Sequence, residues 1–228
     1  MRGVARALAA GALGLLLFNV HGAAQQRPTF REILAGEADI DDFDDQFLDS
    51  RFPPPEPGRS YVLVGLHINP SAERLLVFSR DFKLVRELYG WELVTLHNES
   101  IVYHQSQVHF APTHSLEISV FDPRTMIDRH IYPPATQSAV RREFIERVGK
   151  AYQAIGEDWF RQNNHHMDPE RFDSSLLEPI AVDERAGTMS FPVSFGGGDP
   201  ETFSERVLVV CAPLEPVGRI QCHETRAQ

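Results

Sequence analysis

The sequence of 228 residues is poor in cysteine, in basic side chains and in long apolar runs. After residue 24, no stretch approaches the roughly 20 apolar residues that cross a membrane, so we expect no span in that part of the chain. Asp and Glu outnumber Lys and Arg by 32 to 22, which gives a net charge of −10. This charge argues against nucleic-acid binding, which needs a basic surface. The length suits one folded domain with an appendage.

Linear motifs that name a reaction are also absent. The chain has no G-x-S-x-G nucleophile elbow, no H-E-x-x-H zinc motif and no phosphate-binding G-K-S/T loop at its glycine triplet, residues 196–198. A catalytic triad or carboxylate pair that assembles only in space leaves no such pattern. The sequence alone therefore does not name an enzymatic activity.

Residues 1–24 have the pattern of a secretory signal peptide. Arg2 and Arg6 give a positive start, an apolar run covers residues 7–20, and small residues follow at 22–24. The run of 14 residues is shorter than the alternative interpretation, a membrane anchor, requires. We predict cleavage after residue 24 and a secreted or periplasmic protein.

The two cysteines, Cys211 and Cys222, lie in two short β-type runs joined by a segment that contains proline and glycine. An oxidising compartment favours disulfides, and an antiparallel hairpin brings such a pair to bonding distance. Two buried free thiols and a redox pair are the alternatives, but the C-x-x-C spacing of redox pairs is absent. We predict a structural disulfide.

Residues 25–58 read as an acidic arm followed by a proline-rich linker. Thr29 and Glu32 have the spacing of a capping box, which predicts a short helix over residues 30–35. The aspartates of residues 39–49 lack the alternation and the glycine of an EF-hand loop, so a solvated helix face is favoured over a calcium site. We expect a docked arm outside a β-rich domain at residues 59–228.

Residues 61–132 change to the period of strands and predict an antiparallel meander. Residues 75–89 also resemble residues 118–132, at an offset of 43 that equals the length of one propeller blade. Two blade-like hairpin units cannot close a propeller, and an antiparallel sheet of similar hairpins is the other interpretation. The predicted strands are residues 61–68, 74–78, 83–88, 92–97, 101–110, 116–121 and 126–132.

A helical period follows, with one apolar stripe that predicts an amphipathic helix over about residues 136–163, capped by Thr136. Such a helix must bury its stripe against a sheet. Three more strands are expected beyond residue 172, either extending the sheet or forming a satellite sheet closed by the disulfide. The predicted fold class is α+β, mainly β.

Histidine is enriched around the central strands, at His97, His104, His109, His114 and His130. Imidazole is a common ligand of zinc and copper, and strands can bring distant ligands together. Strand alternation separates His104 from His109, whereas the turn before His114 can bring it near His109. A solvated or hydrogen-bonded role is the more common one for such histidines.

Two function classes follow. The main hypothesis is a non-catalytic binding or interaction module that recognises an extracytoplasmic ligand or protein, because a meander presents strand edges and loops. The alternative is a histidine-dependent metal-binding protein or metallohydrolase that holds zinc or copper at His104, His109 and His114. A third possibility is an acidic arm that docks on a basic protein.

Overall fold

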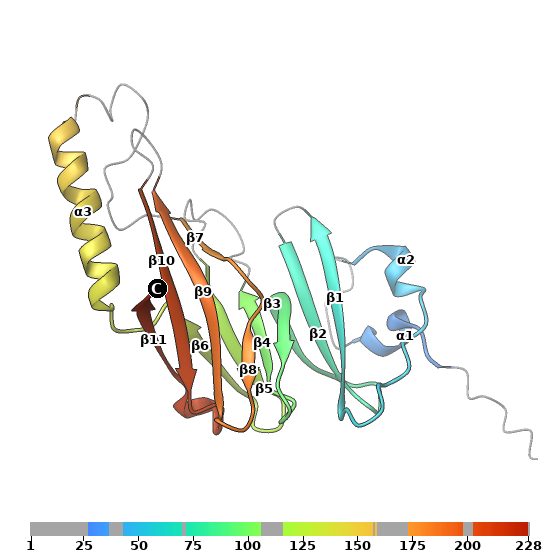
Figure 1. Ribbon diagram of the computed structural model, residues 1–228. Coiled ribbons are helices and arrows are strands. Elements are labelled where there is room, and N and C mark those ends of the chain that lie inside the picture. Colours follow the sequence, from blue (N-terminus) through green and yellow to red (C-terminus); the bar gives the residue numbers. More distant parts are fainter. Residues whose placement is uncertain are drawn as a thin grey trace, which may run out of the picture.

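The computed structural model describes residues 27–36, 43–69, 72–105, 116–156, 158, 173–197 and 203–227 (Figure 1). The predicted signal peptide lies outside these residues. In the part of the chain that the structure describes, no helix is long and apolar enough to cross a membrane.

Six strands form one antiparallel sheet in which each strand pairs with the next along the chain. The sequence predicts seven strands here, and the structure joins residues 83–88 and 92–97 into one strand. The strands are β1 (Tyr61–Asn69), β2 (Ala72–Ser79), β3 (Leu84–Thr95), β4 (Ile101–Gln105), β5 (Ile118–Asp122) and β6 (Ile127–Tyr132).

Strand β3 divides this sheet into two halves. Its residues 84–89 pair with β2, whereas residues 90–95 pair with β4. Gly90 lies at the division with a φ of 140°, which a residue with a side chain rarely adopts. One apolar cluster packs between the two halves, on the concave face of the sheet. Its buried side chains are Leu75, Val77, Leu88, Ile101, Tyr103 and Phe121.

The two hairpins that carry the 43-residue repeat are β2–β3 and β5–β6. Both belong to this one sheet, with β4 between them. Propeller blades are separate four-stranded sheets. The structure therefore gives the blade interpretation no support, and the repeat reflects two similar hairpins of a meander.

A second antiparallel sheet packs against the half of the first sheet that contains β4–β6. It holds five strands rather than the three predicted, because two short strands pair along one edge of β9. Their shared core includes Val102 and Val120 of the first sheet with Phe191, Val193 and Val209 of the second. The strands are β7 (Asp173–Leu176), β8 (Ala181–Asp183), β9 (Thr188–Gly197), β10 (Phe203–Ala212) and β11 (Gln221–Arg226).

The predicted disulfide is confirmed. Cys211 of β10 and Cys222 of β11 are directly opposed in the antiparallel pair and are bonded to each other. The short helix η2 (Val217–Arg219) lies in the connection between the two strands. The disulfide thus joins the last strand to the interior of the second sheet.

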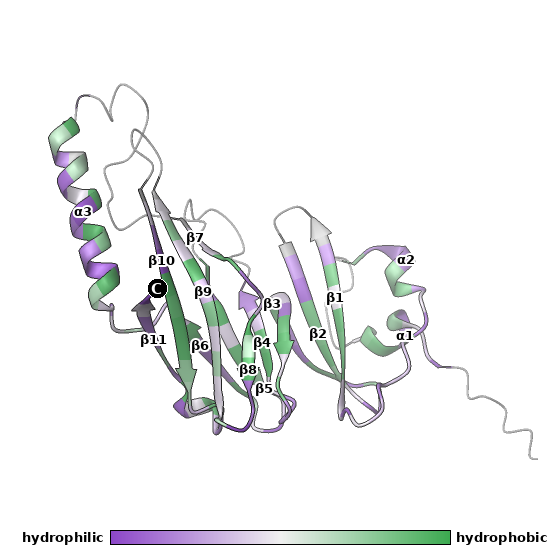
Figure 2. Ribbon diagram, viewed as in Figure 1, coloured by the Kyte–Doolittle hydropathy of each residue, from purple (hydrophilic) through white to green (hydrophobic). Residues whose placement is uncertain are grey.

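Helix α3 (Ala139–Ile155) begins three residues later than predicted. Ser138 rather than Thr136 caps it, since the Ser138 hydroxyl accepts a hydrogen bond from the Arg141 amide at 3.0 Å. Gly156 follows the last helical residue with a φ of 89°, a conformation typical of helix ends. Except for residue 158, the expected remainder of the helix lies outside the described residues. Figure 2 shows apolar and polar residues interspersed along α3, whose buried side chains are Phe144 and Val148.

The N-terminal arm contains helices α1 (Phe30–Leu34) and α2 (Asp45–Leu48) and packs on the convex face of β1 and β2 (Figure 1). The predicted capping box is confirmed, because Thr29 and Glu32 bond each other's backbone. The buried side chains of this cluster are Phe30, Leu34, Phe43, Leu48, Phe52, Val62, Leu76 and Phe78.

Candidate functional site, a groove along the first strand

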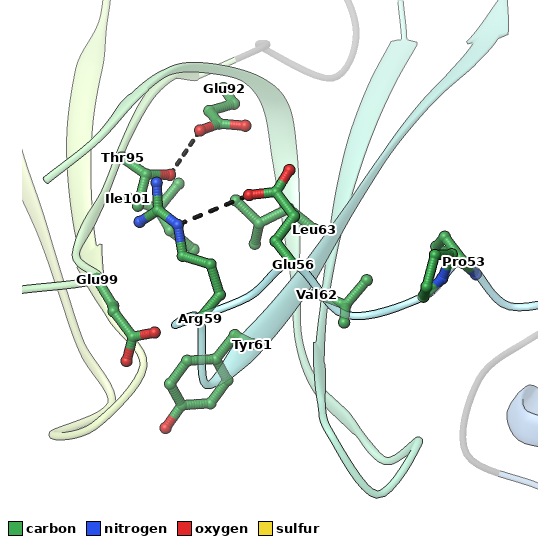
Figure 3. Close-up of a pocket in the computed structure, with 11 residues that line it drawn as sticks. Pro53, Glu56, Arg59, Tyr61, Val62, Leu63, Glu92, Thr95, Glu99 and Ile101 are labelled. Carbon is green, nitrogen blue, oxygen red and sulfur yellow. Dashed lines mark hydrogen bonds and ion pairs between the residues drawn. The ribbon is translucent and has the colours of Figure 1, made fainter. Parts of the chain in front are cut away.

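A cavity of about 210 Å³ opens on the concave face of the sheet, between β1 and the end of β3 (Figure 3). We call it the Tyr61 cavity. Three of its side chains are carboxylates and one is a guanidinium, so it is acidic. It is lined by Pro53, Pro54, Glu56, Arg59, Tyr61, Val62, Leu63, Glu92, Thr95, Glu99 and Ile101.

Hydrogen bonds and an ion pair hold the polar groups of the Tyr61 cavity. Arg59 lies 3.8 Å from Glu56 and reaches across the cavity, as Figure 3 shows. The Thr95 hydroxyl donates to Glu92 at 2.5 Å, and the Ser60 amide donates to Glu99. Each carboxylate therefore has a fixed place while one guanidinium offsets only part of their charge.

A second cavity, of about 280 Å³, lies farther along β1. We call it the Trp91 cavity. It shares Leu63 and Glu92 with the Tyr61 cavity, so the two form one groove along the strand. It is lined by Leu63, Gly65, Leu66, His67, Glu73, Arg74, Leu75, Gly90, Trp91 and Glu92.

Trp91 lines this second cavity and is 41% exposed. Its ring stacks on that of His104, with centroids 3.9 Å apart and an interplanar angle of 11°. Arg74 lies 2.7 Å from Glu87, which offsets its charge, and His67 lies 3.3 Å from Glu73. The cavity thus brings together the carboxylates of Glu73 and Glu92, while the Trp91 ring stacks on His104 on the face of β3 opposite to Glu92.

The outer edge of β1 borders the groove. β1 is the terminal strand of its sheet and pairs only with β2. In the described ranges, no other backbone hydrogen bond reaches residues 61–67. These residues include no Lys, Arg, Asp or Glu and no proline, which are the usual protections of an open edge.

The structure does not bring the described histidines together. His97 is exposed after β3, where its amide donates to Glu184 at 2.8 Å, and His130 is exposed on β6. His109 and His114 lie outside the described residues. Among the residues that the structure does describe, no group of three or more His, Cys, Asp or Glu side chains is placed to hold a metal. The site at His104, His109 and His114 stays a prediction, which metal analysis of protein purified without chelator tests.

His104 is expected to make folding sensitive to acid. Burial lowers the pKa of this imidazole below its ordinary value, although Glu73 acts in the opposite direction. Below about pH 6.5, the unfolded chain then binds the proton more readily than the folded one, so stability falls as the pH drops. Urea denaturation at pH 7.5 and 5.5 measures this effect. Between these two pH values, the free energy of unfolding should fall more for the unmutated protein than for His104→Gln. Equal losses would contradict this role.

No pattern in the sequence indicates the groove itself. Glu56, Glu92 and Glu99 are separated along the chain and fit no motif, and only the fold of β3 brings them to one cavity. Comparisons with protein-family models, curated proteins and solved structures find no match for this chain.

Proposed function

We propose that this protein is a non-catalytic binding module that captures an extended, basic segment of another polypeptide along β1. The observation that carries the proposal is the open edge of β1 beside an acidic groove. An extended segment that adds to a strand edge gains affinity from backbone hydrogen bonds and specificity from side-chain cavities. Both elements occur here on the same strand.

Charge supports a basic partner. The protein has a net charge of −10, and the two cavities together hold four carboxylates, Glu56, Glu73, Glu92 and Glu99. A second copy of this chain suits the edge less well, because pairing β1 with itself brings these like charges together at the cost of repulsion. A polyanion such as nucleic acid meets the same repulsion.

We further propose that the module works in a secreted or periplasmic setting. The disulfide between Cys211 and Cys222 supports this, because such bonds persist in oxidising compartments. The signal-peptide pattern of residues 1–24 supports the same location.

Binding of a labelled nine-residue peptide of alternating valine and arginine tests the proposed function. We expect it to bind, and its counterpart with glutamate in place of arginine not to bind. Two further versions of the arginine peptide carry methyl groups on alternate backbone amide nitrogens, one version on the odd-numbered residues and the other on the even-numbered residues. Both keep the side chains of the arginine peptide. At least one of the two sets of methyl groups should weaken binding at least tenfold, because it removes the hydrogen bonds to β1.

The variant Glu92→Gln should bind the arginine peptide with about fivefold lower affinity, the loss expected for one exposed charge pair. Glu146→Gln, on the exposed face of α3, is the matched control and should change nothing. Fluorescence anisotropy of the labelled peptide measures both. Absence of binding, or binding that neither methylated set weakens, would refute strand addition.

A further inference from the structure

The two cavities of the groove indicate which sequence the bound segment carries. Resting on the proposed function, we infer that this segment presents two basic side chains four residues apart, one for the Tyr61 cavity and one for the Trp91 cavity. This goes beyond general basic character, because it fixes a spacing that can be tested separately.

The spacing follows from the register of β1. Tyr61 and Leu63 line the first cavity, and Gly65 and His67 line the second. All four residues lie on the concave face, since successive side chains of a strand alternate between faces. Tyr61 and Gly65 are four residues apart, as are Leu63 and His67, which is about 13 Å at the rise of a strand. A segment paired with β1 has the same rise, in either direction, so its side chains at positions i and i+4 reach the two cavities.

The Trp91 cavity suits a cationic side chain for two reasons. The carboxylates of Glu73 and Glu92 line it, and a guanidinium or ammonium group that enters pairs with them. The cavity is also open beside the strand, because a Cβ atom added at Gly65 would meet nothing within 4 Å.

The Tyr61 cavity suits a second cation. Glu92 and Glu99 approach it from the β3 side, and Glu56 from the linker before β1. Arg59 pairs with Glu56 at 3.8 Å. Glu92 and Glu99 accept hydrogen bonds from two neutral groups, the Thr95 hydroxyl and the Ser60 amide, so they keep their negative charge for the ligand. The Tyr61 hydroxyl donates to the Pro123 carbonyl at 3.3 Å, which holds the ring at the cavity wall.

Three peptides of equal length test the spacing. Each is built on valine and threonine; one has arginines at i and i+4, one at i and i+3, and one has a single arginine. A pair at i and i+3 points to opposite faces of a strand. We expect the i, i+4 peptide to bind about tenfold more tightly than either of the others, as the second cation gains its own cavity.

The variant Gly65→Phe closes the Trp91 cavity. Because the added Cβ meets no neighbour, the fold should be retained, which circular dichroism checks. The variant should lower the affinity of the i, i+4 peptide to that of the single-arginine peptide. The affinity of the single-arginine peptide should not change. Leu208→Phe, which places the same ring at an exposed position of β10, is the matched control and should have no effect.

The outcomes separate the two proposals. If the i, i+4 and i, i+3 peptides bind equally and Gly65→Phe changes neither, the spacing is wrong and strand addition stands. If no basic peptide binds, the proposed function and the spacing fail together. If sedimentation shows a dimer that Gly65→Phe dissociates, the groove holds a second copy of the chain and both proposals are overturned.

Discussion

Replacing Arg141 by methionine is expected to lower the free energy of unfolding by about 3–5 kcal/mol, the cost of breaking a buried ion pair on one side. Arg141 of α3 lies 2.6 Å from Glu224 of β11, and the Glu224 side chain is 0% exposed. The Ser138 and Tyr132 hydroxyls complete the network at 2.6 Å from Glu224 and 2.9 Å from Arg141. Without the guanidinium, a buried carboxylate loses its counter-charge.

Two further variants make this result specific. Arg141→Met combined with Glu224→Leu removes both charges and should recover most of the lost stability, because no charge is left unpaired. Arg147→Met breaks the ion pair with Glu205, where Arg147 is 48% exposed, and should cost less than about 1 kcal/mol. Urea denaturation at pH 7 measures all three. A double variant no more stable than Arg141→Met would show that packing, not charge, holds the helix here.

The variant Phe52→Ala should cost about 3–5 kcal/mol, the range for deleting a buried phenyl group. Phe52 is 0% exposed and fixes the end of the arm against the sheet. Its ring centroid lies 5.1 Å from that of Phe78 and 5.2 Å from that of Phe82, both edge to face. Truncation leaves a cavity between the arm and β2.

Phe47→Ala is the matched control in the same arm. Phe47 is only partly buried and stacks on Phe30 with centroids 4.4 Å apart, so its loss should cost about 1–2 kcal/mol. Equilibrium unfolding followed by circular dichroism compares the two variants. Equal and small losses would mean that the arm adds little to stability, and would favour the interpretation of the arm as a docking element for another protein.

Local patterns predicted the local structure correctly. The capping box at Thr29 and the hairpin that joins Cys211 to Cys222 depend on residues close in sequence, so a single sequence contains their signal. The apolar stripe of α3 is equally local. The sequence predicts Thr136 as its cap and the structure has Ser138, because serine and threonine are both good caps.

The path of β3 was not predictable in the same way. Gly90, between Tyr89 and Trp91, is a residue that usually interrupts a strand pattern, and so the sequence suggested two strands. In the structure the strand continues through Gly90 and changes its partner there. Pairing with β2 on one side and β4 on the other is a long-range property that no periodicity encodes.

The candidate site was hidden for the same reason. The histidine enrichment indicates the central strands, where His104, the described member of the predicted metal set, stacks on the Trp91 ring. The groove is built by glutamates that look like ordinary solvated charges in the sequence. Their meaning depends on which of them the folded sheet places around one cavity.

Because β3 belongs to both halves of its sheet, the chain itself connects the groove to the sandwich. Leu75 and Val77 of one half are buried against Ile101, Tyr103 and Phe121 of the other. The Ser60 amide and the Tyr61 hydroxyl also donate hydrogen bonds across to the other half. The walls of the groove are therefore held apart by the same buried core that stabilises the fold.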